Sequence, residues 1–258
     1  MNIAIVGAGN VAWHVAQGLQ ATGNAVTAVY SRTLTQASEL TNLLPGAVAK
    51  ADLDFRDVAT DVILIAVPDA AIFSVANQLK ITPGSIVAHT SGSQPISVLG
   101  SIDGADTGVF YPLQTFSKQA PVNLQQVPIL VEGSTEQATQ KLEQLAQSIS
   151  TKVEHVTSEK RKQLHLAAVF ACNFTNHLLG ISQELLQKAD LTKDLLQPLI
   201  QETITKAATH NPFTVQTGPA IRGDKNVIED HLQLLENNPL LQSIYQQLTQ
   251  SIQEKKLS

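Results

Sequence analysis

The sequence predicts an α/β fold for the first part of the chain and an all-helical fold for the remainder. Short apolar runs alternate with stretches of helical spacing up to about residue 155, a pattern typical of a parallel sheet covered by helices on both faces. From about residue 158 the strand pattern ends and only long stretches of helical spacing follow. We therefore expect two domains, at residues 1–155 and 156–258.

The strands of the first domain are expected to be short and buried. Residues 3–6 and 62–67 are apolar without alternation, which indicates strands covered on both faces. Turn-forming pairs such as Pro83-Gly84 separate the elements. The predicted strands are residues 2–6, 25–30, 61–66, 85–89, 107–110 and 128–132, with a last one at 152–156. The predicted helices are residues 11–21, 34–43, 71–78 and 136–148.

The second domain is expected to consist of long helices. They are predicted at residues 160–189, 193–209, 227–236 and 239–255. The first is apolar, yet it carries His165 and Asn173 and further polar residues. Because buried polar groups need partners, this helix predicts an internal hydrogen-bond network or a cleft. Its pattern fits either the core of one chain or the seam of a dimer.

Charge balance and cysteine content exclude several classes of protein. With 17 basic and 22 acidic side chains, the net charge is −5. The cluster of charged residues at 159–162 is interpreted as a solvated helix start. No nucleic-acid partner is therefore expected. The single Cys172 excludes a multi-cysteine metal site, and its apolar surroundings predict a buried side chain. No apolar run has the length of a membrane-spanning helix, and no signal-peptide pattern follows Met1. We therefore expect a cytoplasmic protein with no metal and no membrane partner.

A glycine motif follows the first predicted strand. Gly7, Gly9 and Ala12 form the pattern GxGxxA between a strand and a helix. In dinucleotide-binding units such residues permit the tight turn, the close approach of a pyrophosphate and the packing of helix on strand. The helix N-terminus then offers free N–H groups to phosphates. The predicted cofactor contacts are Gly7, Ala8, Gly9, Asn10 and Val11. The alternative is a tight turn without a ligand.

The end of the second predicted strand distinguishes two nicotinamide cofactors. An acidic residue there usually binds the ribose 2′-hydroxyl of NAD, whereas an arginine suits the 2′-phosphate of NADP. Here Ser31, Arg32 and Thr33 stand at this position and no acid is present. NADP is therefore predicted in preference to NAD. In the alternative, Arg32 stacks on the adenine without contacting the phosphate.

Val67, Pro68 and Asp69 follow the strand predicted at residues 61–66. The carboxyl edge of an open α/β sheet is where ligands bind. We expect Val67 and Pro68 to form an apolar wall beside the cofactor, and Asp69 to cap the helix that follows.

Polar residues also follow the next two predicted strands. His89 is a candidate for proton transfer near the nicotinamide, and a role in orienting its own loop fits equally well. Ser91 and Gly92 are expected to form a substrate-anchoring turn. Tyr111 and Gln114 are candidates for lining a pocket, although aromatic residues at such places more often serve packing.

A turn-rich segment at residues 217–224 ends with Arg222 and Asp224. Two interpretations stand side by side. Arg222 binds an anionic substrate or orients a neighbouring helix, or it forms an ion pair with Asp224 that stabilises the loop.

These motifs together resemble a known bacterial family. The segments GAGNVA, YSRT, IAVPD, AHTSGS, YPLQTF, HLAAVFACNFTNHL and TGPAIRGD are similar to the family with a Rossmann-like NADP-binding domain and a C-terminal domain named DUF2520. The resemblance covers essentially the whole chain. It implies an architecture similar to pyrroline-5-carboxylate reductase, ketopantoate reductase and the 6-phosphogluconate dehydrogenase superfamily, with a helical domain that often forms a dimer and a substrate cleft between the domains.

The same relatives imply catalytic residues on the first long helix. Ketopantoate reductase and the hydroxyacid dehydrogenases use a lysine there and an asparagine further along, and this chain offers His165 and Asn173. If His165 replaces the lysine, it is the proton donor or acceptor for hydride transfer. This difference puts an alcohol or keto-acid substrate in doubt.

Two functions are compatible with these expectations. The first is an NADP-dependent oxidoreductase acting on a small carbonyl, imine or hydroxy compound, with catalytic candidates His165, Asn173 and His89 and a site completed by Arg222. The second is a non-catalytic NADP-binding or redox-sensing protein, because fold alone does not establish catalysis. A homodimer through the helical domain is expected in either case.

Overall fold

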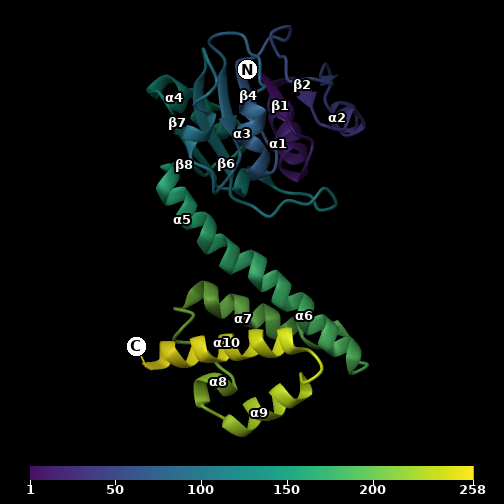
Figure 1. Ribbon diagram of the computed structural model, residues 1–258, viewed down its shortest axis with the longest axis vertical. Helices are drawn as coiled ribbons and strands as arrows, with labels where there is room; N and C mark the ends of the chain where they lie inside the picture. Colours follow the sequence, from purple (N-terminus) through teal and green to yellow (C-terminus); the bar gives the residue numbers. More distant parts are fainter. Residues whose placement is uncertain (258) are drawn as a thin grey trace. The chain divides into compact units, whose positions relative to one another are not determined.

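An eight-stranded sheet forms the centre of the N-terminal part in the computed structural model, which describes residues 1–257 (Figure 1). Its strand order is β3-β2-β1-β4-β5-β6-β7-β8, and all neighbours are parallel except β6 and β7. The strands are β1 (Asn2–Val6), β2 (Ala25–Tyr30), β3 (Val48–Lys50), β4 (Val62–Ile65), β5 (Ile86–His89), β6 (Asp106–Pro112), β7 (Ile129–Gly133) and β8 (Val153–His155). The order through β6 is that of the Rossmann fold, as the sequence predicts.

Both faces of the sheet are buried. In β1, Ile3 and Ile5 belong to one apolar cluster, and Ala4 and Val6 belong to another. The first cluster includes residues of α1 (Asn10–Ala21), α2 (Leu34–Thr41) and α4 (Glu136–Ile149). The second includes residues of α3 (Asp69–Ala76) and the short helix η1 (Ile96–Leu99). The continuous apolar runs of the sequence therefore correspond to strands covered on both sides.

The predicted elements of this part are present, with three additions: β3, η1 and η2 (Leu124–Gln126). Strand β3 was not predicted, because three residues at the sheet edge that end in Lys50 carry no apolar pattern. The short helix η2 precedes β7.

An unbroken helical run occupies residues 158–188. It comprises α5 (Ser158–Ala168), a π-helical segment η3 (Val169–Phe174) and α6 (Thr175–Lys188). Of the two alternatives for this run, the core of one chain does not hold, because Leu166 is 58% exposed and Phe170 63% exposed. The prediction that Cys172 is buried is wrong, because its side chain is exposed. No apolar run of membrane-spanning length was expected, and that expectation is wrong. Residues 158–188 form the one described helix that is long and apolar enough to cross a membrane.

The chain divides into two compact units, the first ending at His177 and the second beginning at Leu178. The second unit is helical, with η4 (Lys193–Leu195), α7 (Gln197–Thr209), α8 (Pro219–Arg222), α9 (Lys225–Leu234) and α10 (Pro239–Leu257) (Figure 1). Helix α8 lies where the sequence predicts only turns, because Pro219 starts a single helical turn after Gly218. Within this unit α8 contacts both α9 and α10.

Candidate functional site

Three neighbouring strands, β1, β4 and β5, end at the same level of the sheet, and β6 continues beyond it to Pro112. Val6 pairs with Ile65, Ile65 with His89, and His89 with Val109. The segments that leave these strands therefore lie along one edge. This edge holds most of the residues that the sequence singled out, and it is the edge where open α/β sheets bind ligands.

A cavity of about 550 Å³ lies at the ends of β1, β2 and β4. Its size is within the range of ligand pockets. The predicted cofactor residues that line it are Gly7, Ala8, Gly9, Ser31, Arg32, Thr33, Val67 and Pro68. Asn10 and Val11 do not line it but form the first turn of α1. Eight of the ten predicted cofactor residues thus surround one cavity.

The two glycines at this cavity have different surroundings. Gly7 has φ +123°, and a Cβ there would lie 2.2 Å from the carbonyl oxygen of Ala66, so only glycine fits. A Cβ on Gly9 would meet no atom within 4 Å. Space beside Gly9 and an α1 N-terminus without a side-chain cap are what a dinucleotide pyrophosphate requires. The residues present therefore fit a dinucleotide.

The end of β2 presents a cation to the same cavity. Arg32 and Thr33 are exposed, and the buried Ser31 donates a hydrogen bond to Gln36 at 3.4 Å. An exposed guanidinium beside two hydroxyl groups suits a phosphate group.

Asp69 does not cap α3, which corrects the sequence-based interpretation. No side chain caps this helix, and the Asp69 carboxylate instead accepts a short hydrogen bond from the Ser93 hydroxyl. The bond links the segment after β4 to the loop after β5. Asp69 follows Pro68 in the chain and Ser93 follows Gly92. The hydrogen bond between them therefore connects the cavity wall to the loop that carries Gly92.

His89 is fully buried, and both its ring nitrogens are engaged in its own loop. Nδ1 accepts from the Ser91 N–H at 3.1 Å, and Nε2 donates to the Pro95 carbonyl at 3.3 Å. Burial, with the nearby charge of Arg161, lowers the pKa of His89 to about 4. These contacts favour the loop-orienting interpretation over proton transfer. The Ser91 hydroxyl also serves the loop, accepting from the N–H groups of Ser93 and Gln94.

Tyr111 and His165 meet over Gly92. The Tyr111 hydroxyl lies 3.0 Å from Nδ1 of His165, and the two rings contact edge to face. A Cβ on Gly92 would lie 2.6 Å from Nδ1 of His165 and 2.7 Å from Cζ of Tyr111. Burial, with the charge of Asp69, raises the pKa of Tyr111 and keeps it a phenol. The arrangement combines a proton donor with a group able to return the proton.

Three other predicted residues have surroundings of their own. Gln114 is exposed, and its side-chain oxygen accepts from the N–H of Thr115 at 2.8 Å. Asn173 is exposed in η3. Arg222 is exposed in the second unit and forms an ion pair with Asp224 at 2.7 Å, as the structural interpretation of this segment anticipates.

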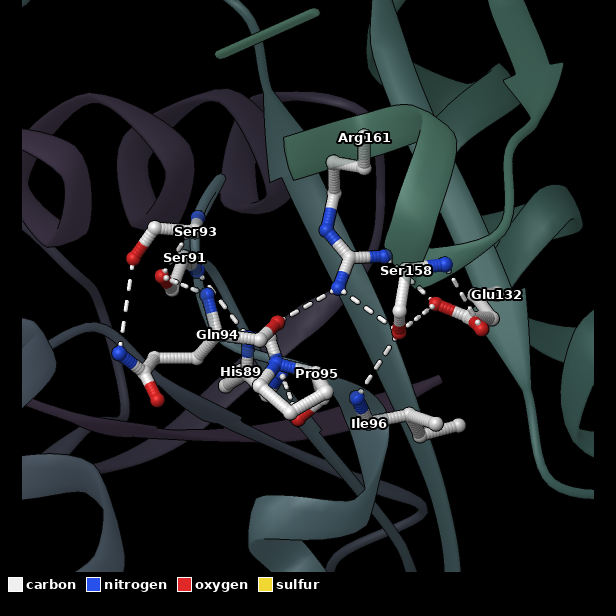
Figure 2. A network of polar contacts seen from close by, with 9 residues as sticks. All are labelled: His89, Ser91, Ser93, Gln94, Pro95, Ile96, Glu132, Ser158 and Arg161. Atoms are coloured by element: carbon white, nitrogen blue, oxygen red, sulfur yellow. Dashed lines mark hydrogen bonds and ion pairs between the residues drawn. The ribbon is translucent and has the colours of Figure 1, made fainter. Parts of the chain in front are cut away.

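Arg161 was missed at this edge. The charged cluster at residues 159–162 predicts a solvated helix start, yet Arg161 is 1% exposed and pairs with Glu132 (Figure 2). One signal was available: Arg161 lies four residues before His165, so both project from one face of α5.

A Rossmann sheet with this cavity and this polar edge defines a nicotinamide-dependent oxidoreductase class. Residues 2–91 match the family described as "NADP oxidoreductase coenzyme F420-dependent", and residues 127–252 match "Domain of unknown function (DUF2520)". A proposed NADP oxidoreductase of Bacteroides fragilis is 39% identical, with 98% of each chain covered and a TM-score of 0.91. The chain belongs to this DUF2520-containing family of NADP oxidoreductases, whose cofactor is NADP.

Two more distant structures share the fold. A reductive aminase of Aspergillus terreus, in complex with NADPH and ethyl levulinate, is 15% identical over 98% of this chain and 92% of that chain, with a TM-score of 0.71. A pyrroline-5-carboxylate reductase of Streptococcus pyogenes is 15% identical over 99% and 98%, with a TM-score of 0.62. No curated protein sequence matches the chain.

Proposed function

We propose that the protein is an NADPH-dependent reductase acting on the C=N or C=O bond of a small substrate beside Gly92, Tyr111 and His165. The single observation that carries this proposal is the Tyr111–His165 hydrogen bond over Gly92, at the same sheet edge as the dinucleotide cavity. NADPH supplies the hydride when bound. The chain supplies orientation and a proton.

The cofactor residues have separate roles in this proposal. The backbone at Gly7, Ala8 and Gly9 and the first amides of α1 at Asn10 and Val11 bind the pyrophosphate. Ser31, Arg32 and Thr33 bind the 2′-phosphate. Val67 and Pro68 form the apolar wall that directs the nicotinamide toward Gly92.

Tyr111 and His165 form the proton route. Reduction of a C=N or C=O bond leaves a nitrogen or oxygen that needs a proton, which the Tyr111 phenol donates. Nδ1 of His165, 3.0 Å away, returns a proton to the phenolate. His89 and Ser91 orient the loop that holds Gly92. The reductive aminase and the pyrroline-5-carboxylate reductase that share the fold support the choice of substrate class.

A homodimer is part of the proposal. Among the described side chains from Leu178 onward, Ala220 alone is a buried hydrophobic residue, while Leu195, Leu199 and Ile204 are more than half exposed. Burial of apolar surface is the main force that holds helices together. A second copy of the chain provides that burial, covering these helices together with the exposed side chains of residues 158–188.

The test is a fluorescence titration of the purified protein with NADPH and NADH, repeated for Arg32→Ala. Loss of the phosphate contact is expected to weaken NADPH binding by about 10- to 100-fold and leave NADH binding unchanged. Arg56→Ala is the matched control, since Arg56 is also exposed but pairs with Asp54.

Turnover is then measured as NADPH oxidation with ethyl levulinate, alone and with an amine, and with cyclic imines. Binding with turnover supports the reductase. Binding with no turnover on any carbonyl or imine would favour the redox-sensing alternative, and no binding of either nucleotide would overturn both.

A further inference from the structure

A buried polar network joins three segments beside the proposed site. Figure 2 shows Arg161 and Ser158 of α5, Glu132 of β7, and the loop from His89 to Ile96. Arg161 donates to Glu132 at 2.5 Å and, through Nη2, to the Gln94 carbonyl at 2.6 Å. The Ser158 hydroxyl donates to Glu132 at 2.8 Å and accepts from the Ile96 N–H at 3.0 Å. The loop is therefore held at two points by α5.

The loop held in this way carries Gly92. Only one residue separates Gly92 from Gln94, whose carbonyl Arg161 binds. At the other end, Ser91 is bonded to His89 in the buried core of the sheet. Between these anchors Gly92 packs so tightly that a Cβ would collide with both Tyr111 and His165.

We propose that Arg161 is a positioning residue for the reaction, which sets the loop at Gly92 against the Tyr111–His165 pair without touching cofactor or substrate. The inference rests on the reductase function proposed above. Arg161 and His165 lie on one face of α5. The helix that places His165 against Gly92 therefore also binds, through Arg161, the loop that carries Gly92. The helix and the loop thus keep a fixed spacing.

Features of the guanidinium favour positioning over general stabilisation. Arg161 is 1% exposed, and its Nε has no hydrogen-bond partner within the described part of the chain. A buried unpaired donor is unfavourable for stability. The outer nitrogens of the group donate to Glu132, to the Gln94 carbonyl and, at 3.2 Å, to the Ser158 hydroxyl. A planar fork meets these acceptors at once, which the single ammonium of a lysine does not do with the same geometry.

The experiment compares Arg161→Lys with Ser158→Ala and with the control Lys162→Gln, an exposed neighbour on the same helix. The substrate-independent measurement is the ¹⁵N NMR signal of the His165 ring nitrogens, assigned by its loss in His165→Gln. Thermal unfolding and NADPH titration show whether each variant is folded and binds cofactor. Where a turnover substrate is in hand, kcat and KM are measured as well.

Positioning predicts a displaced His165 signal in Arg161→Lys and a smaller displacement in Ser158→Ala, with NADPH affinity within about threefold of wild type. It also predicts a loss of kcat of at least tenfold in Arg161→Lys, with KM changed less. Lys162→Gln changes none of these. An unchanged His165 signal in Arg161→Lys overturns the proposal. If Arg161→Lys does not fold, an unchanged signal in Ser158→Ala overturns it in the same way. The NMR result needs no substrate, so failure to find turnover, which would count against the reductase, leaves this test intact.

Discussion

The hydroxyl of Tyr111 and Nδ1 of His165 lie 3.0 Å apart, although 54 residues separate them in the chain. Tyr111 leaves the sheet near the end of β6, and His165 projects from α5. Gly92 packs against both rings and leaves no room for a side chain. The pair and the glycine together define the contact surface of the proposed substrate site.

Gly92→Ala is expected to separate this pair. The new Cβ would lie within 2.8 Å of three atoms of Tyr111 and His165, so at least one ring must move. We expect kcat to fall by about tenfold or more, because catalytic geometry tolerates little displacement. NADPH affinity, measured by fluorescence titration, is the internal control and should remain near wild type. Full activity in a folded Gly92→Ala protein would show that the pair has no part in the reaction.

Tyr111→Phe and His165→Gln test the proton route directly. Phenylalanine keeps the ring but has no proton to give, and glutamine keeps polarity but does not exchange protons near neutral pH. Each change is expected to lower kcat by about 100-fold, the usual contribution of general acid catalysis. His155→Gln is the control, because His155 is half exposed and pairs with Glu143 on the surface. Equal kcat in all three variants would contradict the assignment.

The sequence was sufficient for seven of the eight strands of the sheet and for eight of the residues that line the cavity. Gly7 and Gly9 are local signals, since the turn after the buried strand requires glycine at position 7 and the close approach of a pyrophosphate favours glycine at position 9. Arg32 was predictable for the same reason, because it stands at a fixed distance from the motif. The fold class and NADP as the cofactor are confirmed.

Contacts between distant segments were not predictable in this way. Arg161 sits in a charged cluster at a helix start, and its burial depends on Glu132, 29 residues away. Asp69 stands at a helix start, where capping is the local expectation, but Ser93 competes for its carboxylate from 24 residues away. The exposure of Phe170 likewise depends on what covers the helix, which the apolar pattern alone does not reveal.

Gly9→Ala is expected to affect NADPH binding, and Gly7→Ala is expected to affect the stability of the fold. The Gly9 Cβ meets no protein atom, so the variant is expected to unfold like wild type while NADPH affinity falls by about tenfold or more, because the methyl group occupies the pyrophosphate's place. The Gly7 Cβ meets backbone at a positive φ, so its unfolding temperature should fall by roughly 6 °C or more. Thermal unfolding and NADPH titration of both variants check this. Unchanged NADPH binding in Gly9→Ala would argue against the cavity as the dinucleotide site.

Phe170→Asp tests the homodimer. The wild-type protein is expected to have twice the chain mass of 27.7 kDa by light scattering after size-exclusion chromatography. An aspartate in place of a side chain that is 63% exposed costs the single chain little but is unfavourable in an apolar interface. We expect monomers or a concentration-dependent equilibrium. Leu43→Asp, at a leucine that is 47% exposed and lies just after α2, should remain dimeric. A monomeric wild type would exclude the dimer outright.

His89 should make the protein less stable in mild acid. Burial lowers its pKa in the folded chain from 6.5 to about 4, so below pH 6.5 the unfolded chain takes up a proton that the folded chain refuses. The free energy of unfolding therefore decreases as pH falls, by about 2 kcal/mol from this group between pH 8 and 5. Urea unfolding of wild type and His89→Asn across this range isolates the contribution, since the two proteins differ only at this residue. The variant starts from lower stability because the Ser91 N–H and the Pro95 carbonyl lose their partner, yet its stability should depend less on pH. Parallel pH profiles would mean that His89 is protonated in the folded protein. That result would contradict the assignment of His89 as a buried neutral imidazole that orients the Gly92 loop.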